Sequence, residues 1–416
     1  MKKNISASVI RTISFLTAVV FTIPGLWKGF QGIHVWLSPF LMLNSVFALK
    51  SFVLLNILAL PVLVLVIIRK RWFCKCLCPA GWCFDKVSAI SKSDNNEYRR
   101  FPDVGKWMAF TSLTAALFGF PLFVVFDPLS IFNGFFIIFS GNMEIAVILS
   151  LFLFPVLLVI HLFFPGIWCR KLCPLGGLQT GLWDIRRHLV QLFTRKGIVS
   201  DTEVRGRKYF LMSGVGLLAG LVLPRILKSQ EKNTIRPPGA TEPVIYNLLC
   251  CRCNNCIKAC PTNIIIPYSD LNLPLSWMTP VISFKSGYCL ESCNLCGKVC
   301  PTGAITLFSI DAKPDLYMGT AVIQTENCYL ANNRECIKCR EACKYNAVEF
   351  LPGSNVLNML PVIDTRKCVG CGACEVVCPA ACISVMSLMQ EEMPQRQKLA
   401  QSQYNTVMNF LKARLM

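Results

Sequence analysis

Sixteen of the chain's 24 cysteines fall into four runs that share one spacing. The last run reads C-x2-C-x2-C-x3-C-P, the ligand pattern that holds cubane iron–sulfur clusters in bacterial ferredoxins. The runs are Cys250, Cys253, Cys256, Cys260; Cys289, Cys293, Cys296, Cys300; Cys328, Cys336, Cys339, Cys343; and Cys368, Cys371, Cys374, Cys378. The second and third runs lengthen the first gap, and the third has Lys344 where the others have proline. This pattern predicts four 4Fe-4S clusters bound by these sixteen cysteines.

Disulfides and zinc are the alternative uses of so many cysteines. A disulfide framework has no reason to repeat one spacing four times, and zinc sites usually consist of two well-separated C-x2–4-C pairs. Within a run, three closely spaced thiolates bind one face of a cubane, and the fourth reaches a different cluster. Two cysteines lie beside the runs: Cys251 is predicted to be a neighbour that does not bind, and Cys382 a buried packing residue.

The first half of the chain is strongly apolar. Hydrophobic residues make up 54% of the 416 residues, and the mean hydropathy of +0.50 exceeds the usual value for a soluble protein. Apolar stretches run at about 12–30, 51–68, 107–126 and 145–165, each near the roughly 20 residues of a bilayer-spanning helix. We therefore expect residues 1–195 to form an α-helical membrane domain with four transmembrane helices.

Basic residues gather on one side of these stretches. They precede the first stretch and follow the second and the fourth, whereas the other loops carry little charge. The positive-inside rule then places the N-terminus and both basic loops in the cytoplasm, so a multi-pass protein of the bacterial cytoplasmic (inner) membrane is expected. The formal net charge of +19 is scattered over these loops, which argues against a face that binds nucleic acid.

Both basic loops carry a second cysteine motif, C-x3-C-P-x-G. The two copies lie 95 residues apart, which predicts that the membrane domain consists of two repeats. The motif cysteines can meet across the repeat axis and hold one further iron–sulfur or metal centre: Cys74, Cys78, Cys169 and Cys173. Cys76 and Cys83 are reserve ligands. The alternative is that each Cys-Pro-x-Gly is only a turn at the exit of a helix.

The remaining segments complete the domain plan. Residues 196–240 hold a glycine-rich, weakly apolar stretch behind a basic cluster, which reads as a twin-arginine-like signal or fifth anchor helix, followed by a linker. Such a signal exports folded domains, so we expect the cluster domain on the outer, periplasmic face. Residues 241–390 are predicted to form this α+β ferredoxin-like domain, and residues 391–416 an amphipathic helix.

On these motifs the chain resembles two families. Residues 1–195, with four apolar stretches and two C-x3-C-P motifs, resemble the membrane polyferredoxins of the NapH and NosR type. The four ferredoxin runs behind a twin-arginine-like leader resemble the ferredoxin-type proteins NapG and MauM. The chain is therefore similar to a fusion of the two.

This resemblance implies a quinol dehydrogenase module. Such a module takes electrons from menaquinol in the membrane quinone pool and passes them to a respiratory reductase or another electron carrier. Resemblance to four-cluster subunits also implies nested pairing of the runs, the first with the fourth and the second with the third, so that Cys260 and Cys378 exchange clusters. The alternative functions are an accessory or maturation factor for a reductase and a redox-sensing regulator.

A quinol site needs a proton acceptor, and ionisable residues near apolar segments are its candidates. They are His34, Asp127, Glu144 and His161. Absent motifs narrow the function further. The chain has no C-x-x-C-H for c-type haem and no glycine motif of the Walker or dinucleotide-binding kind, so no nucleotide is expected.

Overall fold

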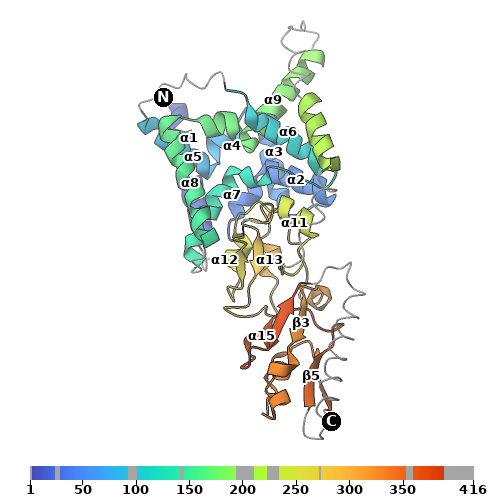
Figure 1. Ribbon diagram of the computed structural model, residues 1–416. Coiled ribbons are helices and arrows are strands. Elements are labelled where there is room, and N and C mark those ends of the chain that lie inside the picture. Colours follow the sequence, from blue (N-terminus) through green and yellow to red (C-terminus); the bar gives the residue numbers. More distant parts are fainter. Residues whose placement is uncertain are drawn as a thin grey trace.

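The structure is a computed structural model in which two regions follow each other along an elongated molecule (Figure 1). A helical region occupies one end, and a cysteine-run region, which begins at residue 234, extends away from it. The described residues are 2–23, 29–91, 101–140, 145–193, 210–222, 234–270, 273–352 and 359–387. Glu144 and the predicted amphipathic helix at 391–416 lie outside them.

Short helices make up most of the helical region, because turns interrupt the apolar stretches. Lys50, Arg71 and Phe123 adopt left-handed backbone conformations at helix boundaries, where a regular helix cannot continue. The α-helices are α1 (Lys2–Thr22), α2 (Pro39–Leu49), α3 (Ala59–Ile68), α4 (Trp72–Cys76), α5 (Pro79–Ile90), α6 (Val104–Ala116), α7 (Pro128–Phe135), α8 (Ile145–Phe163) and α9 (Pro174–Phe193). Shorter turns are η1 (Ile33–Leu37), η2 (Leu54–Leu58), η3 (Val124–Phe126), η4 (Phe136–Ser140) and the π-helical η5 (Trp168–Leu172). One more helix covers 210–222.

The structure corrects the predicted membrane domain. Among the helices of the described ranges, none has both the length and the apolar character needed to cross a bilayer. The stretches at 51–68 and 107–126 contain helices of 10 and 13 residues, α3 and α6, and Pro155 lies inside α8. The prediction of four transmembrane helices in two repeats with a fifth anchor helix is therefore wrong. The predicted multi-pass location in the inner membrane is wrong on the same finding.

Glycines let α6 and α9 approach each other at backbone distance. A Cβ added to Gly177 of α9 would overlap the backbone of Gly105 in α6, and one added to Gly105 would overlap the carbonyl group of Cys173. Hence α6 rests directly on the loop that carries the second C-x3-C-P motif.

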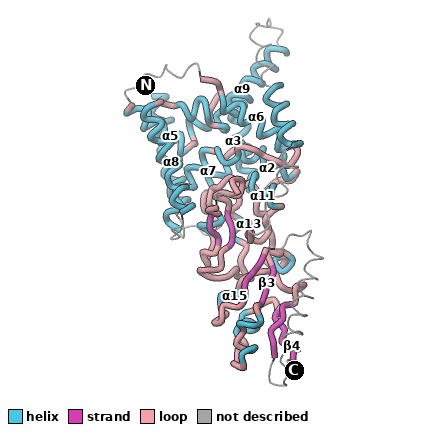
Figure 2. Tube along the Cα trace, viewed as in Figure 1, coloured by secondary structure: helices cyan, strands magenta, loops and turns pink. Residues whose placement is uncertain are grey.

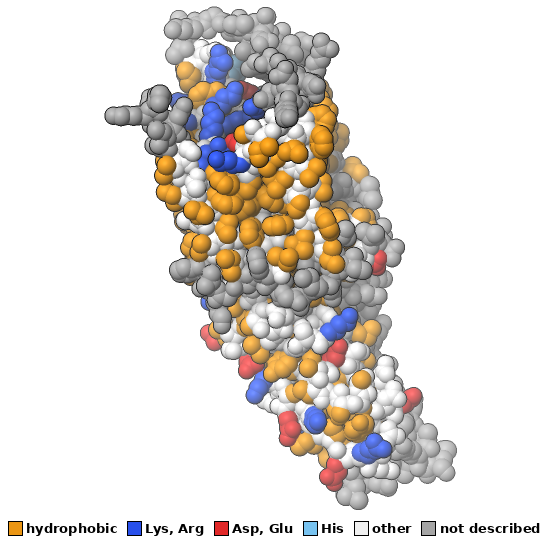
Figure 3. Space-filling model, turned by 90° about the vertical axis from the view of Figure 1, so that its left-hand side faces the viewer, with side chains coloured by type: hydrophobic (Ala, Val, Ile, Leu, Met, Phe, Trp, Pro, Cys, Tyr) orange, Lys and Arg blue, Asp and Glu red, His pale blue; other side chains and the backbone are white. Residues whose placement is uncertain are grey.

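The surfaces of the two regions differ. On the face shown in Figure 3, hydrophobic side chains cover most of the helical region, and Lys and Arg gather towards its end farthest from the cysteine-run region. Exposed apolar residues include Leu16 of α1 and Phe152 and Val159 of α8. On the cysteine-run region, charges of both signs are scattered among the apolar atoms.

The cysteine-run region combines very short helices and strands (Figure 2). Its described strands form three two-stranded antiparallel sheets, which pair β1 with β2, β3 with β6, and β4 with β5. The strands are β1 (Ile265–Pro267), β2 (Pro280–Ile282), β3 (Thr320–Ile323), β4 (Val348–Pro352), β5 (Met359–Ile363) and β6 (Ile383–Met386). The helices are α11 (Pro243–Leu249), α12 (Asn255–Ala259), α13 (Leu295–Lys298), α14 (Lys338–Ala342) and α15 (Ala373–Val376), with 3-10 turns η6 (Lys313–Asp315), η7 (Thr325–Asn327) and η8 (Leu330–Asn332).

Candidate iron–sulfur sites

Every cysteine run folds in the same local way. The third cysteine is the second residue of a short helix, and the last cysteine follows that helix. Three residues beyond the last cysteine, the backbone turns through a left-handed conformation, at Asn263, Gly303, Asn346 and Ala381. Glycine and asparagine tolerate this conformation, and alanine does so only under strain. The repeated spacing thus produces four copies of one loop.

The structure sorts the sixteen cysteines into four groups, each with three cysteines of one run and the last cysteine of a neighbouring run. Group A is Cys250, Cys253, Cys256 and Cys300; group B is Cys289, Cys293, Cys296 and Cys260; group C is Cys368, Cys371, Cys374 and Cys343; and group D is Cys328, Cys336, Cys339 and Cys378. Runs one and two exchange their last cysteines, as do runs three and four. The nested pairing that the resemblance implied is therefore wrong, since consecutive runs pack against each other.

Burial makes the thiols of these groups difficult to ionise. Burial, with a further contribution from cysteines of the same group, raises the pKa of Cys250 to about 12 and the pKa values of Cys371 and Cys339 to about 11. Four thiolates at such a site need bound cations, which the irons of a cluster supply. No set of three His, Cys, Asp or Glu in the described ranges gathers closely enough for a single metal ion. A cubane has no such requirement, because its four cysteines bind four different irons.

The groups follow one another in the order A, B, C, D, away from the helical region. Cys256 of group A interacts electrostatically with group B. The backbone N–H of Cys289 in group B donates a hydrogen bond of 2.9 Å to the carbonyl oxygen of Cys371 in group C. Cys374 of group C interacts with group D in turn. Figure 1 shows α15, β3 and β5 at the end of the molecule far from the helical region.

Group A is fastened to the helical region by buried hydrogen bonds. The Asn133 side chain of α7 donates to the carbonyl oxygen of Cys253 at 2.5 Å and to Oδ1 of Asn255 at 2.7 Å. Lys258 of α12 donates to Oδ1 of Asn133 at 3.1 Å. Cys253 also belongs to the same apolar core as Phe132 of α7. Group A therefore begins where the helical core ends.

Two buried lysines beside groups A and B were missed at the sequence level. Lys258 lies near Cys253 and Cys256, and burial lowers its pKa to about 8. Lys313 is only 2% exposed, donates to the carbonyl oxygen of Cys293 at 2.6 Å and interacts with Cys289. Their positive charges offset the negative charge of thiolate groups in a dry environment. Nothing in their sequence spacing distinguishes them from surface lysines.

The two C-x3-C-P motifs meet inside the helical region. Burial first, and then neighbouring cysteines of these motifs, raise the pKa values of Cys78, Cys169 and Cys173. The mutually interacting set, called the helical cysteine group below, is Cys74, Cys78, Cys169 and Cys173. Gln179 of α9 donates a hydrogen bond of 3.0 Å to the sulfur of Cys74 and so joins α9 to the first motif.

The Cys-Pro-x-Gly part of each motif lies between a short helix, α4 or η5, and the start of the next helix, α5 or α9. The Sγ atoms of Cys78 and Cys173 accept hydrogen bonds of 3.3 Å from the N–H groups of Gly81 and Gly176, at the starts of α5 and α9. Proline occupies the first position of both helices, where its missing N–H costs nothing. A Cβ on either glycine would approach the carbonyl oxygen of the first motif cysteine, at 3.4 Å in the first motif and 2.8 Å in the second.

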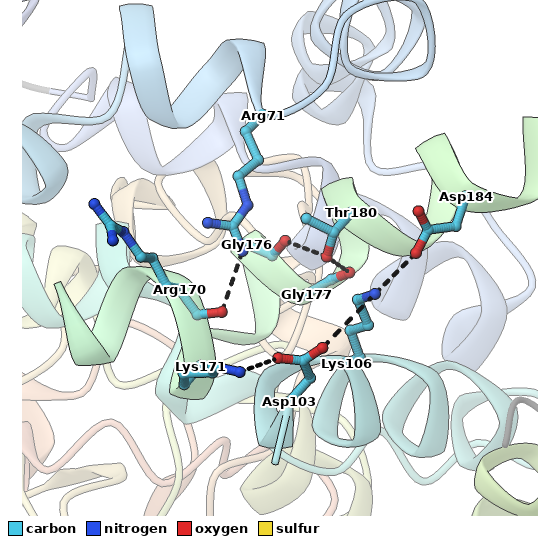
Figure 4. Close-up of polar contacts among 9 residues, drawn as sticks. All are labelled: Arg71, Asp103, Lys106, Arg170, Lys171, Gly176, Gly177, Thr180 and Asp184. Carbon is cyan, nitrogen blue, oxygen red and sulfur yellow. Dashed lines mark hydrogen bonds and ion pairs between the residues drawn. The ribbon is translucent and has the colours of Figure 1, made fainter. Parts of the chain in front are cut away.

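Polar contacts hold the two motif loops together (Figure 4). Arg71, which precedes the first motif, donates a hydrogen bond of 3.2 Å to the carbonyl oxygen of Arg170 in the second. Lys171 of the second motif pairs with Asp103 at 2.9 Å, next to the start of α6. Asp103 also lies 3.9 Å from Lys106. The loops therefore stay in contact with each other and with α6.

His34 lines a cavity beside the first motif. The cavity measures about 110 Å³, and its wall includes Thr17 of α1 and Leu77 and Pro79 of the first motif. His34 is buried, and neither ring nitrogen has a hydrogen-bond partner among the described residues. Burial, and then the charge of Lys258, lowers the pKa of His34 to about 3, so its ring is neutral at pH 7.

The other described quinol-site candidates lie outside this wall and have structural partners. Asp127 caps α7, where its carboxylate accepts hydrogen bonds from the Leu129 N–H at 2.9 Å and the Ser38 hydroxyl at 2.7 Å. Burial raises its pKa to about 6. The Nδ1 atom of His161 lies 2.7 Å from the carbonyl oxygen of Leu157, and its ring stacks on Phe84 with 4.2 Å between centroids. Of the three described quinol-site candidates, His34 is therefore the one that lines the cavity.

Comparisons with known proteins bear on the cysteine runs. A family model described as a 4Fe-4S binding domain matches residues 359–380. The chain is 31% identical over 207 residues to the ferredoxin-type protein NapG of Escherichia coli (strain K12), covering 45% of this chain and 89% of NapG. It is 30% identical over 184 residues to the methylamine utilization ferredoxin-type protein MauM of Methylobacillus flagellatus, covering 42% and 77%. It is 34% identical over 159 residues to the ferredoxin-type protein NapF of Haemophilus influenzae, covering 38% and 82%. No solved structure matches the chain.

Proposed function

We propose that this chain, which belongs to the family of ferredoxin-type proteins that includes NapG and MauM, conducts electrons along four 4Fe-4S clusters held by groups A to D. The observation that carries the proposal is the unbroken order of the groups, each beside the next, from the helical core to the far end of the molecule. The clusters supply the redox chemistry, and the chain supplies their order, burial and hydrogen bonds.

The electron donor in this proposal is a quinol of the menaquinol type, bound in the cavity beside His34. The volume of about 110 Å³ is smaller than the roughly 150 Å³ of a cavity that accommodates benzene, so the cavity would admit one edge of the quinol ring system with its hydroxyl group. The neutral imidazole of His34 has a lone pair with which to accept a hydrogen bond from a quinol hydroxyl.

The position of the cavity fits this role. Oxidation of a quinol to a quinone releases two electrons and two protons. The electrons need a nearby acceptor, and group A lies close by, because Lys258 acts on both His34 and Cys253. The protons leave towards the surface at Thr17, which is exposed while His34 is buried.

We also infer that the helical cysteine group holds a further iron–sulfur cluster. Its four sulfurs come from both motifs, and Cys78 and Cys173 are buried in the apolar core that also contains Cys253 of group A. This centre would stand beside the quinol cavity, since Leu77 and Pro79 adjoin Cys78 and line that cavity. On this proposal residues 1–195 act as a NapH- or NosR-like module joined to a ferredoxin-type region.

The electron acceptor is a partner protein that docks near group D, either a respiratory reductase or another electron carrier. Group D ends the order of the groups, and its Cys336 is only partly buried. An accessory role at such a reductase remains the alternative function, and the same experiment separates it from electron transfer.

The test is reduction of the full-length, cluster-loaded protein by a water-soluble menaquinol analogue, followed by the bleaching of cluster absorption in a stopped-flow instrument. His34→Gln is expected to slow the reduction at least tenfold, whereas His161→Gln, a buried histidine outside the cavity, leaves the rate unchanged. Reduction by dithionite should be equal in all three proteins. Equal quinol rates in all three would remove the quinol site, and a protein that the quinol never reduces would favour the accessory role.

A further inference from the structure

Group D contains a fifth cysteine, Cys382, in addition to its four. Cys382 is 3% exposed and shares the wall of one cavity with the other cysteines of the group. Its sulfur lies 3.5 Å from the sulfur of Cys378, and it also interacts with Cys328. Two of the proposed cluster ligands therefore border this additional thiol.

The equivalent positions in the other runs show that packing alone does not require a thiol here. Four residues beyond the last cysteine, the first three runs have Ile264, Ala304 and Ala347, each 2% exposed. A methyl group is enough to fill the position in two of the four loops. The expectation from the sequence, that Cys382 is only a packing residue, thus leaves its sulfur unexplained.

A hydrogen-bond donor beside the last cysteine is common to all four runs. The Thr262 hydroxyl lies 3.6 Å from the sulfur of Cys260. Backbone N–H groups donate to the last cysteines of the next two runs, from Ile305 to Cys300 at 3.4 Å and from Ala347 to Cys343 at 3.3 Å. For Cys378 the neighbour within reach is the thiol of Cys382.

The backbone holds this thiol firmly. Ala381 has a φ of 47°, a conformation in which an alanine is strained by roughly 1 kcal/mol or more. Hydrogen bonds also fix the backbone of Cys382, the next residue. Its carbonyl oxygen accepts a hydrogen bond of 2.8 Å from the Gln324 N–H, and Ile383 begins the pairing of β6 with β3. The loop therefore presents Cys382 in one orientation.

We propose that Cys382 is a positioning residue whose S–H donates a hydrogen bond to the sulfur of Cys378 and raises the reduction potential of the cluster in group D. A cysteine thiol is a weak hydrogen-bond donor, and the sulfur of Cys378 lies within its reach. Hydrogen bonds to cluster sulfurs favour the reduced, more negative state, and thereby raise the potential. The consequence for function, that electrons are drawn towards the far end, rests on the proposed order of the groups. The shift in the reduction potential of the group D cluster does not depend on that order.

The experiment is an EPR-monitored redox titration of full-length protein with chemical mediators, after measurement of iron and acid-labile sulfide. Cys382→Ala is expected to keep all the iron and to move one midpoint potential to a lower value. Cys382→Ser retains a donor and is expected to keep that potential close to the wild-type value. Cys251→Ala, which removes the additional cysteine beside Cys253 of group A, should leave the potential of group D in place.

Three outcomes would overturn the inference. Unchanged potentials in Cys382→Ala would show that the thiol has no effect on the cluster. Equal shifts in the alanine and serine variants would point to packing. Loss of about 4 irons per chain in either variant would make Cys382 necessary for holding the cluster. Because no quinol is used, failure of the quinol proposal would leave this result unaffected.

Discussion

The cysteine-run region and the helical region both bring four cysteines together, but they do so by different means. In groups A to D, three of the four come from one run and share a single loop. In the helical cysteine group, two pairs come from loops 95 residues apart. They meet through tertiary contacts, among them the hydrogen bonds from Gln179 to Cys74 and from Arg71 to Arg170. Local spacing therefore protects the first kind of site from changes elsewhere, and the second kind depends on helix packing.

The largest effect is expected from breaking the order of the groups inside the cysteine-run region. Cys371→Ala removes a member of group C, which lies between groups B and D. The protein should lose about 4 of the roughly 16 irons of groups A to D, and the quinol analogue should then reduce groups A and B but not group D. Iron analysis and freeze-quench EPR measure both effects. Full reduction of group D in this variant would contradict the proposed order.

A smaller effect, confined to the helical region, is expected from its own cysteines. Cys74→Ala removes one member of the helical cysteine group, so any iron or other metal beyond the clusters of groups A to D should be lost while those clusters remain. Cys76→Ala is the matched control, because Cys76 is in the same short helix but outside the interacting set. Identical metal contents in wild type and both variants would argue against a further centre.

The smallest effect concerns pH and only the helical region. Burial raises the pKa of Asp127 from 3.8 to about 6. Its neutral form is favoured in the folded state, so its contribution to stability is complete below pH 4 and is lost as the pH rises through about 6. Between pH 5 and pH 7 the free energy of unfolding should fall by about 1 kcal/mol from this group.

Asp127→Asn is the variant that isolates the pH-dependent contribution of Asp127 to the free energy of unfolding. Asparagine also caps helices and can accept the hydrogen bonds at the start of α7, so the fold should be kept while the pH dependence disappears. Thermal unfolding followed by far-UV circular dichroism at pH 5, 6 and 7 measures the difference. A variant whose unfolding temperature follows the same pH profile as the wild type would refute the assignment to Asp127.

The ferredoxin-type part of the chain was predictable because its information is local. A spacing of two residues places successive thiols on one side of a tight loop, and the family comparison confirms 4Fe-4S binding and the ferredoxin-type relationship. The number of clusters and the sixteen ligands remain proposals. The exchange of last cysteines was not predictable, since it depends on which runs pack together.

The helical part was predictable only in its motifs. The apolar stretches predicted long helices that cross a membrane, but the described helices are cut by left-handed turns at residues such as Lys50 and Arg71. Hydrophobicity does not show where a helix will break. The sequence allowed two interpretations of the motifs, a shared centre or a turn. Only the packing of the helices brings together their cysteines Cys74, Cys78, Cys169 and Cys173.

The sequence by itself determined the cysteine runs, the paired C-x3-C-P motifs and the ferredoxin-type chemistry, because these depend on the spacing of neighbouring residues along a flexible chain. The tertiary structure decided which cysteines share a group, that the groups lie in the order A, B, C, D, and that His34 borders a cavity while Cys382 faces Cys378. These properties join residues that are distant in sequence or set their orientation, and only the packed core can determine them.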